Sequence, residues 1–188
     1  MEYYILFLPL LASCIVGFFG KKIGDKASGI ITSLFVVIST LLSFIVFFKV
    51  LNSGYSNNLV ISSWINSGSL NVNWAINIDS LSSVMLVVVT LVSALVHIYS
   101  IGYMSHDPHK PRFMAYLSLF TFAMLTLVTS DNFIQLFFGW EGVGLCSYFL
   151  IGFWYKKPTA NAAAIKAFVV NRVGYFVFAI GIFLIFFF

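Results

Sequence analysis

Six long apolar stretches separated by short polar connections dominate the pattern along this chain. A helix needs about 20 residues to cross the hydrocarbon core of a bilayer, and each stretch reaches or approaches that length. The stretches are continuously apolar and do not alternate with a period of two, so they predict transmembrane helices and not barrel strands. The predicted spans are Tyr3–Gly20, Ile30–Leu51, Leu81–Met104, Phe113–Val128, Phe133–Tyr155 and Ala162–Phe188.

The sizeable segment between spans two and three, residues 52–80, shows a different period. Apolar and polar residues alternate from Leu70 to Ile78, and a second apolar run, Leu59–Ile65, precedes the turn signal Asn66–Gly68. This pattern predicts a β-hairpin. We expect its role to be structural, because paired tryptophans on a hairpin usually pack on each other or at a membrane interface.

Composition agrees with a polytopic membrane protein built from α-helices. Hydrophobic residues make up 61% of the chain and charged residues 9%, whereas soluble domains carry about 25% charged residues. The net charge of +4 does not indicate a nucleic-acid partner, because the cations lie between apolar runs and form no basic face. Cys14 and Cys146 lie in different spans without metal-ligand spacing, so we interpret both as small packing residues.

The basic residues near the membrane surface predict an orientation. They follow spans one, three and five, so they fall on one side, which the positive-inside rule assigns to the cytoplasm or the mitochondrial matrix. The N-terminus and the hairpin then lie on the periplasmic or intermembrane side, where Asp131 is expected to cap span five. These basic residues are Lys21, Lys22, Lys26, Lys110, Arg112, Lys156 and Lys157.

The chain reads as one membrane domain, residues 1–188. It comprises two spans in 1–51, the hairpin segment 52–80, and spans three to six in 81–188. The last apolar run reaches Phe188 without a polar flank, so we expect this domain to be the incomplete first part of a larger bundle.

Three charged residues lie deep inside the predicted spans, where charge is expensive, whereas Lys49 lies at the outer end of span two and can extend to the interface. Glu141 interrupts span five, and Lys166 and Arg172 interrupt span six. Counted from Tyr155 and Ala160 at the helical rise, Glu141 lies ~21 Å deep and Arg172 ~18 Å deep, so the two could pair. Such residues commonly belong to ion or proton paths, at a cost of roughly 2.5–3.5 kcal/mol each.

Two interpretations of these charges remain open. A buried ion pair can simply lock two helices together. Alternatively, desolvation favours the neutral form of Glu141 and nearby cations favour its charged form, so movement of a cation would transfer a proton. The second interpretation makes Glu141, Arg172 and Lys166 candidate proton-translocating residues.

Histidines and glycines supply weaker candidates. His97, inside span three, is either a proton relay or a buried histidine satisfied by a neighbouring carbonyl. His106 and His109 are expected to lie in a solvated loop and not to bind metal. The glycines around Glu141 lie in an apolar helix, which excludes a nucleotide loop and favours close helix packing or a bend that admits water.

The stretch SDNFIQLFFGWEGVGLCSYFLIGFWY, with AAIKAFVVNRVG after it, resembles the large antiporter-like membrane subunit of respiratory complex I. NIDSLSSVMLVVV, HIYSIGYMSHDP and RFMAYLSLFTFAML support the resemblance, which covers most of residues 70–174. It implies a protein of roughly a dozen or more spans with inverted repeats, whose large proton-translocating bundle begins in 81–188.

The resemblance also implies roles for single residues. Glu141 matches the family's proton-translocating glutamate, Arg172 the arginine of NRVG and Lys166 the lysine of KAF. A partner lysine is expected in span seven, beyond these six spans. The family pattern commonly continues as NRVGD, whereas this chain has Tyr175 in place of the aspartate, which puts the local charge network in doubt.

Three functions follow as expectations. The first is a proton-translocating membrane-arm subunit of NADH:quinone oxidoreductase, embedded in the bilayer beside other membrane-arm subunits, with NADH and quinone bound elsewhere and no cofactor in this chain. The second is the large subunit of a multisubunit sodium/proton antiporter. The third is a scaffold subunit with an inert ion pair. The sequence shows no cysteine set for an iron–sulfur cluster and no flavin or nucleotide motif.

Overall fold

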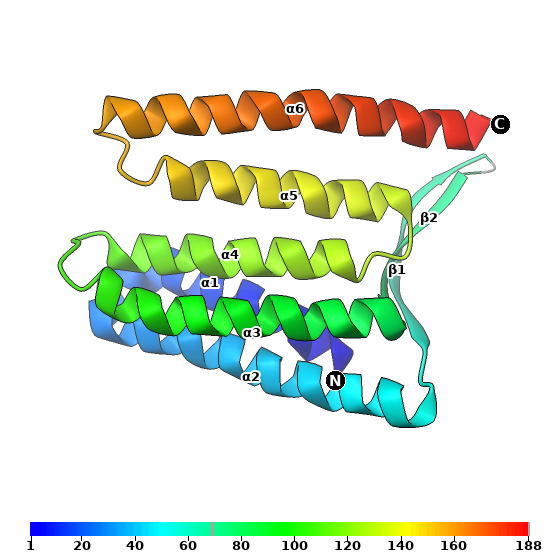
Figure 1. Ribbon diagram of the computed structural model, residues 1–188, viewed down its shortest axis with the longest axis horizontal. Coiled ribbons are helices and arrows are strands. Elements are labelled where there is room, and N and C mark those ends of the chain that lie inside the picture. Colours follow the sequence, from blue (N-terminus) through cyan, green and yellow to red (C-terminus); the bar gives the residue numbers. More distant parts are fainter. Residues whose placement is uncertain (69, 188) are drawn as a thin grey trace.

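The computed structural model describes residues 1–68 and 70–187, and these residues form six helices and one β-hairpin (Figure 1). All six helices are long and apolar enough to cross a membrane, which confirms the predicted architecture. Phe188, at the end of the last predicted span, lies outside the described residues. The elements are α1 (Glu2–Ile23), α2 (Asp25–Ser53), β1 (Asn57–Ser67), β2 (Leu70–Ile78), α3 (Ser80–Tyr103), α4 (Lys110–Val128), α5 (Phe133–Ile151) and α6 (Pro158–Phe187).

The end of α5 differs from the prediction. The helix ends at Ile151, four residues before Tyr155, and the Gly152 amide bonds back to the Tyr148 carbonyl at 2.9 Å. The chain then turns, and α6 begins at Pro158. Lys157 precedes this proline, and the residue before a proline disfavours the helical conformation, so α6 does not start earlier. Proline at the first helical position needs no hydrogen-bond partner there.

The helices alternate in direction, and α5 and α6 lie in a row beyond α4 (Figure 1). Helix α1 packs against α2 and α4, α2 against α3, α4 against α5, and α5 against α6. Helix α6 lies at the edge, where Ala164 and Tyr175 are its buried described residues. The outward face of α6 is therefore apolar and exposed.

The hydrophobic core lies near the hairpin end of the bundle. There, side chains from α1, α2, α3 and α4 enclose two isoleucines of β2. Burying these side chains fixes the hairpin against the helix ends, since each stabilises the fold by about 1.5–3 kcal/mol. The core residues are Ile5, Leu6, Val46, Val50, Ile76, Ile78, Leu86 and Leu125.

The α1–α2, α3–α4 and α5–α6 connections share the end of the bundle opposite the hairpin (Figure 1). We call it the basic end, since it carries the seven cations. Of the seven, Lys156 and Lys157 lie in a loop, whereas Lys21 and Lys22 lie in the last turn of α1, Lys26 in the first turn of α2, and Lys110 and Arg112 in the first turn of α4. Lys110 is only 4% exposed, and its ammonium donates to the Ile101 carbonyl at 2.8 Å, near the C-terminus of α3 where a cation is favoured.

The hairpin is present as predicted, with β1 and β2 antiparallel. Pairing continues to Ser67 opposite Leu70, so the turn is tighter than the expected Asn66–Gly68, and Gly68 has the positive φ of 59° that glycine adopts easily. Trp64 and Trp74 pack edge to face with ring centroids 5.1 Å apart, which confirms the expected packing of the tryptophans on each other.

The free edge of β2 is covered by the segment between α4 and α5. Every second residue of β2 from Asn73 to Asn77 presents its backbone groups along this edge. The Asn77 amide donates to the Thr129 carbonyl at 2.9 Å, and the Asn132 side chain donates to the Asn73 carbonyl at 2.9 Å. Between them, the Gln135 amide accepts from the Ala75 N–H at 3.0 Å and donates to the Ala75 carbonyl at 2.7 Å.

These contacts satisfy an edge that would otherwise remain open. They also fix the entry of α5 relative to the hairpin. The polar residue Asp131 does not cap α5 as expected: the cap is Asn132, whose side chain accepts from the Gln135 amide at 2.8 Å. Asp131 instead accepts from Asn58 of β1 at 2.6 Å. Its carboxylate thus binds the hairpin, and the Asn132 side chain occupies the cap position.

Candidate functional site

Glu141 and Arg172 form an ion pair between α5 and α6, as the depth estimate predicted. The Arg172 Nη1 donates to Glu141 Oε2. Counted from the helix ends at Ile151 and Pro158, Glu141 lies ~15 Å and Arg172 ~21 Å from the basic end at 1.5 Å per residue. Among the described residues this is the one ion pair between two side chains.

Aromatic rings line the α5–α6 contact above and below the ion pair. Rings from the two helices lie with centroids 5.3–6.4 Å apart, a spacing typical of attractive aromatic pairs. These rings belong to Phe137, Trp140 and Tyr148 of α5 and to Phe168, Tyr175 and Phe178 of α6. The two helices are thus held by rings along their length and by one charge pair in the middle.

Arg172 lies between two rings of its own helix. Its guanidinium carbon is 4.7 Å from the Phe168 ring centroid and 5.8 Å from that of Tyr175. Both distances allow cation–π attraction, which is strongest where water is excluded. The guanidinium therefore stays at the level of Glu141 without a second carboxylate.

Tyr175 occupies the position where the resemblance led us to expect an acidic residue. Its hydroxyl donates to the Trp140 carbonyl at 3.2 Å, and its ring lies against Gly144. A Cβ on Gly144 would overlap the phenol, so this glycine is required for the close approach of α6. Tyr175 thus contributes packing and a neutral hydrogen bond in place of a second negative charge beside Arg172.

The other glycines of the segment serve the contact with α4. A Cβ at Gly139 would lie 2.7 Å from the backbone of Leu127, and one at Gly142 would lie 3.1 Å from the Ala123 Cβ. Of the two roles expected for these glycines, the structure shows the close packing of neighbouring helices. Helix α5, which contains Glu141, therefore packs closely on α4 at Gly139 and Gly142 and on α6 at Gly144.

The exposure of the charged groups differs from that of other polar groups in the spans. The Glu141 side chain is 21% exposed and the Arg172 side chain 48% exposed. Lys166 lies six residues before Arg172 in α6, nearer the basic end, and is exposed. No ion pair joins it to a residue that the structure describes. The structure does not bring Lys166 into direct contact with Glu141.

His97, in contrast, is fully buried between α3 and α4. Its Nδ1 lies 2.8 Å from the Ser93 carbonyl, and its Nε2 lies 3.0 Å from the Ser118 hydroxyl. The arrangement fits a neutral ring that donates through Nδ1 and accepts through Nε2. The Ser93 hydroxyl also bonds to that of Thr121 at 2.5 Å. Of the two interpretations of His97, the structure supports the histidine satisfied by a neighbouring carbonyl.

The loop between α3 and α4 holds the two remaining histidines. Among the described residues, no group of three or more histidine, cysteine and acidic side chains could hold a metal ion. The loop's Asp107 instead accepts from the Trp154 indole at 2.9 Å and from the His109 amide at 2.8 Å. This contact joins the α3–α4 loop to the α5–α6 loop.

Sequence reasoning missed the polar contacts that join elements far apart in the chain. Gln135 was treated as part of an apolar run, although it is fully buried and clamps Ala75. The Ser118 hydroxyl and the inward-turned Lys110 were missed too. One signal was available for Gln135: a lone amide three residues into a span needs a partner, because an unsatisfied amide in hydrocarbon is costly.

Two protein-family models match this chain. The family model described as "NADH-Ubiquinone oxidoreductase (complex I), chain 5 N-terminus" matches residues 64–114. The model described as "NADH:quinone oxidoreductase/Mrp antiporter, TM" matches residues 130–188, which include Glu141 and Arg172. The two models together match more than half of the chain.

Curated relatives match over nearly the whole chain. NADH-ubiquinone oxidoreductase chain 5 of Chondrus crispus is 55% identical over 186 residues, which are 99% of this chain and 28% of the relative. NADH-quinone oxidoreductase subunit L of Rhodobacter capsulatus is 54% identical over 194 aligned positions, which are 100% of this chain and 27% of the relative. The chain thus spans a little over a quarter of the length of these relatives.

The fold also occurs in a solved structure. A chain of the archaeal membrane-bound sulfane sulfur reductase, a respiratory membrane complex, superposes with a TM-score of 0.81 at 19% identity. The match covers 96% of this chain and 36% of that chain. At this identity the match concerns the fold alone.

The fold and the intramembrane charge pair define an antiporter-like membrane subunit of the kind shared by respiratory complexes and Mrp antiporters. Within that class, the identity to its relatives is decisive. The chain belongs to the family of complex I chain 5, called subunit L in bacteria.

Proposed function

We propose that this chain is a proton-translocating membrane-arm part of NADH:quinone oxidoreductase, with Glu141 as its proton-transfer group. The observation that carries the proposal is the Glu141–Arg172 ion pair, which lies inside the spans and is partly open on one side. Quinone reduction elsewhere in the complex would supply the energy, since this chain needs no cofactor of its own for proton transfer.

The chemistry of the pair supports such a role. The Arg172 guanidinium donates to Glu141, so the two opposite charges balance each other between α5 and α6. Withdrawal of the guanidinium would leave an unbalanced charge inside the spans, and uptake of a proton by Glu141 would remove it. The return of the cation would release that proton.

Lys166 and His97 have different parts in this proposal. Lys166 is exposed and lies nearer the basic end than the Glu141–Arg172 pair, so its ammonium would attract or repel charge along a route to that end. His97 is enclosed by α3 and α4 and its ring nitrogens are occupied by Ser93 and Ser118. We therefore assign His97 a fixed role between these helices and leave proton transfer to the α5–α6 site.

The proposed setting follows from the basic end. By the positive-inside rule, its seven cations favour the cytoplasmic or matrix side for this end, and the N-terminus and hairpin would then lie on the periplasmic or intermembrane side. The inner membrane of bacteria or mitochondria is the corresponding location. The partners would be other membrane-arm subunits, with NADH and quinone bound by further subunits.

The test uses the full-length chain assembled in its native membrane. The assembled complex should oxidise NADH with quinone, and Glu141→Gln should lower proton translocation about tenfold or more, because the amide cannot exchange a proton. Glu2→Gln provides a matched control, since Glu2 lies at the start of α1 far from the pair. If Glu141→Gln assembles and pumps like the parent, the ion pair is a static lock and the chain is a scaffold in this region.

The sodium/proton antiporter remains the second candidate, because the family description for residues 130–188 includes Mrp antiporters. It predicts that the tagged parent chain copurifies with small antiporter subunits and without NADH oxidation. In that case the Glu141→Gln variant should lose sodium-dependent proton exchange in membrane vesicles. Copurification of NADH:quinone reductase activity would reject this candidate.

A further inference from the structure

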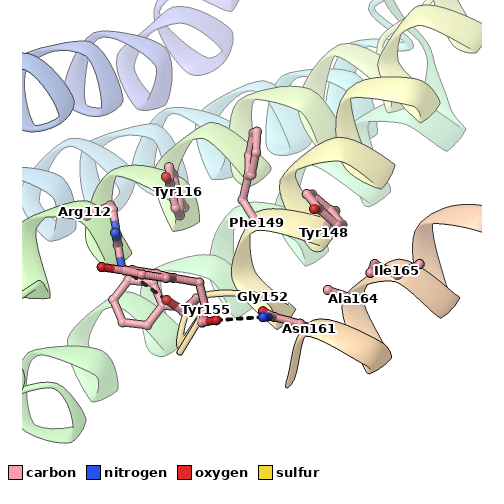
Figure 2. Close-up of a pocket in the computed structure, with 10 residues that line it drawn as sticks. Arg112, Tyr116, Tyr148, Phe149, Gly152, Tyr155, Asn161, Ala164 and Ile165 are labelled. Carbon is pink, nitrogen blue, oxygen red and sulfur yellow. Dashed lines mark hydrogen bonds between the residues drawn. The ribbon is translucent and has the colours of Figure 1, made fainter. Parts of the chain in front are cut away.

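A cavity of about 540 Å³ lies between α4, α5 and α6 at the basic end (Figure 2). Its volume is within the range of small-ligand pockets, about 300–1,000 Å³. Neither Glu141 nor Arg172 lines this cavity, and the nearest lining residue on α5, Tyr148, is seven residues, or ~10 Å of helix, from Glu141 toward the basic end. The lining residues are Arg112, Tyr116, Tyr148, Phe149, Gly152, Phe153, Tyr155, Asn161, Ala164 and Ile165.

The cation in the wall of this cavity is incompletely used. The Arg112 Nη2 donates to the Phe153 carbonyl at 3.1 Å, and the guanidinium carbon lies 4.7 Å and 5.5 Å from the Phe153 and Tyr155 ring centroids. Its Nε is buried and has no hydrogen-bond partner. A guanidinium carries five N–H donors, so Arg112 can still bind an anion.

The opposite wall adds a second positive feature. Asn161 and Ala164 lie in the first two turns of α6, whose N-terminus is the positive end of a 30-residue helix. The Asn161 side chain donates to the Tyr155 carbonyl at 2.6 Å and so fixes the α5–α6 loop beside the cavity (Figure 2). That loop carries Lys156 and Lys157.

The remaining walls are mainly aromatic rings, together with Ile165 at the start of the apolar face of α6. The Tyr116 and Phe149 rings stack with centroids 5.3 Å apart. Ile165 of α6 lines the cavity and is 57% exposed, and Val169, one turn further into the span, is 55% exposed. An occupant with an anionic head and an apolar tail fits this arrangement better than a small inorganic anion does.

We propose that this cavity binds the phosphate-bearing headgroup of an anionic phospholipid. Arg112 and the start of α6 contact the phosphate, the tyrosine rings contact the glycerol region, and the acyl chains follow the exposed face of α6. Basic pockets between spans near a membrane surface are suited to such headgroups, because charge and hydrophobic contact act together. The lipid would also brace α4 against the α5–α6 loop.

The test uses the full-length chain in its purified complex, depleted of lipid by detergent exchange. Phosphatidylglycerol, phosphatidylcholine or inorganic phosphate is added back, and binding is followed by native mass spectrometry and by the melting temperature. Phosphatidylglycerol should bind and raise the melting temperature, whereas phosphatidylcholine and phosphate should have little effect. Equal binding of both lipids, or stabilisation by phosphate alone, would overturn the proposal.

Two variants test the site from different directions. Arg112→Gln removes the cation and should weaken phosphatidylglycerol binding about tenfold or more. Ile165→Trp fills the mouth of the cavity from an exposed position, so it should block binding without disturbing the fold. Lys22→Gln removes an exposed cation at the same end outside this cavity and should bind like the parent. If both site variants retain parental affinity, the lipid does not bind here.

Discussion

The clamp between Gln135 and β2 makes a quantitative prediction. Replacing Gln135 with leucine keeps a side chain of similar length but removes both hydrogen bonds to Ala75. Gln135 and Ala75 are fully buried, so water cannot replace the lost partners. Each unsatisfied backbone group costs about 1–3 kcal/mol, so the hairpin edge should lose roughly 2–6 kcal/mol of local stability.

Hydrogen exchange followed by mass spectrometry of the purified complex measures this loss directly. A factor of ten in exchange rate corresponds to about 1.4 kcal/mol, so a peptide covering residues 72–78 should exchange at least about tenfold faster in Gln135→Leu. Gln135→Glu keeps an acceptor for the Ala75 N–H and loses the donor, so its Ala75 amide should exchange more slowly than that of the leucine variant. Parental exchange in Gln135→Leu would refute the clamp.

Three further variants test other contacts. Gly144→Ala should separate α5 from α6 and lower the melting temperature of the complex, whereas Gly174→Ala, with open space at its Cβ, should change stability by no more than about 1 kcal/mol. Ser118→Ala should cost about 1–3 kcal/mol by leaving His97 Nε2 unpartnered, which thermal unfolding would reveal. The Ser82 amide in the first turn of α3 donates to Asp79 and holds the pKa of that carboxyl below its ordinary value of 3.8. The cap therefore contributes its full stability above pH 3.8 and loses it as the pH falls through the lower pKa of the folded state. Asp79→Ala should accordingly destabilise α3 by about 1 kcal/mol at pH 7 and progressively less as the pH falls below the folded pKa, as measured by exchange of its first turn.

The helices and the hairpin could be predicted because each depends on a local pattern. Twenty apolar residues specify a span whatever surrounds them, and the alternation from Leu70 to Ile78 specifies a strand. The pairing of Glu141 with Arg172 was also within reach, since a short connection makes α5 and α6 antiparallel and the depths then match. These predictions needed only the rise per residue and the side of the membrane.

The contacts that depend on three-dimensional register could not be predicted. Nothing in the sequence states that the backbone of Ala75 reaches Gln135, sixty residues away. The same holds for the choice of Asn132 over Asp131 as the cap, which depends on the position of Asn58 in the neighbouring hairpin. The earlier end of α5 was missed because aromatic residues after Gly152 keep the hydropathy high although the backbone has already turned.

The structure separates two kinds of polar group inside the spans. Gln135 and His97 are neutral, fully buried and fully hydrogen-bonded, so a change of protonation or position would break contacts that hold elements together. Glu141 and Arg172 are charged, and the exposed fractions of their side chains, 21% and 48%, leave part of each free to meet a further group. Proton transfer needs a group that can gain and lose its partner at a low cost in free energy. A partly exposed ion pair meets that condition, whereas a buried hydrogen-bond network with all its partners in place does not. Neutral polar residues therefore act as fixed supports where α3, α4, the start of α5 and the hairpin meet, whereas the charged pair between α5 and α6 is the candidate site of proton transfer.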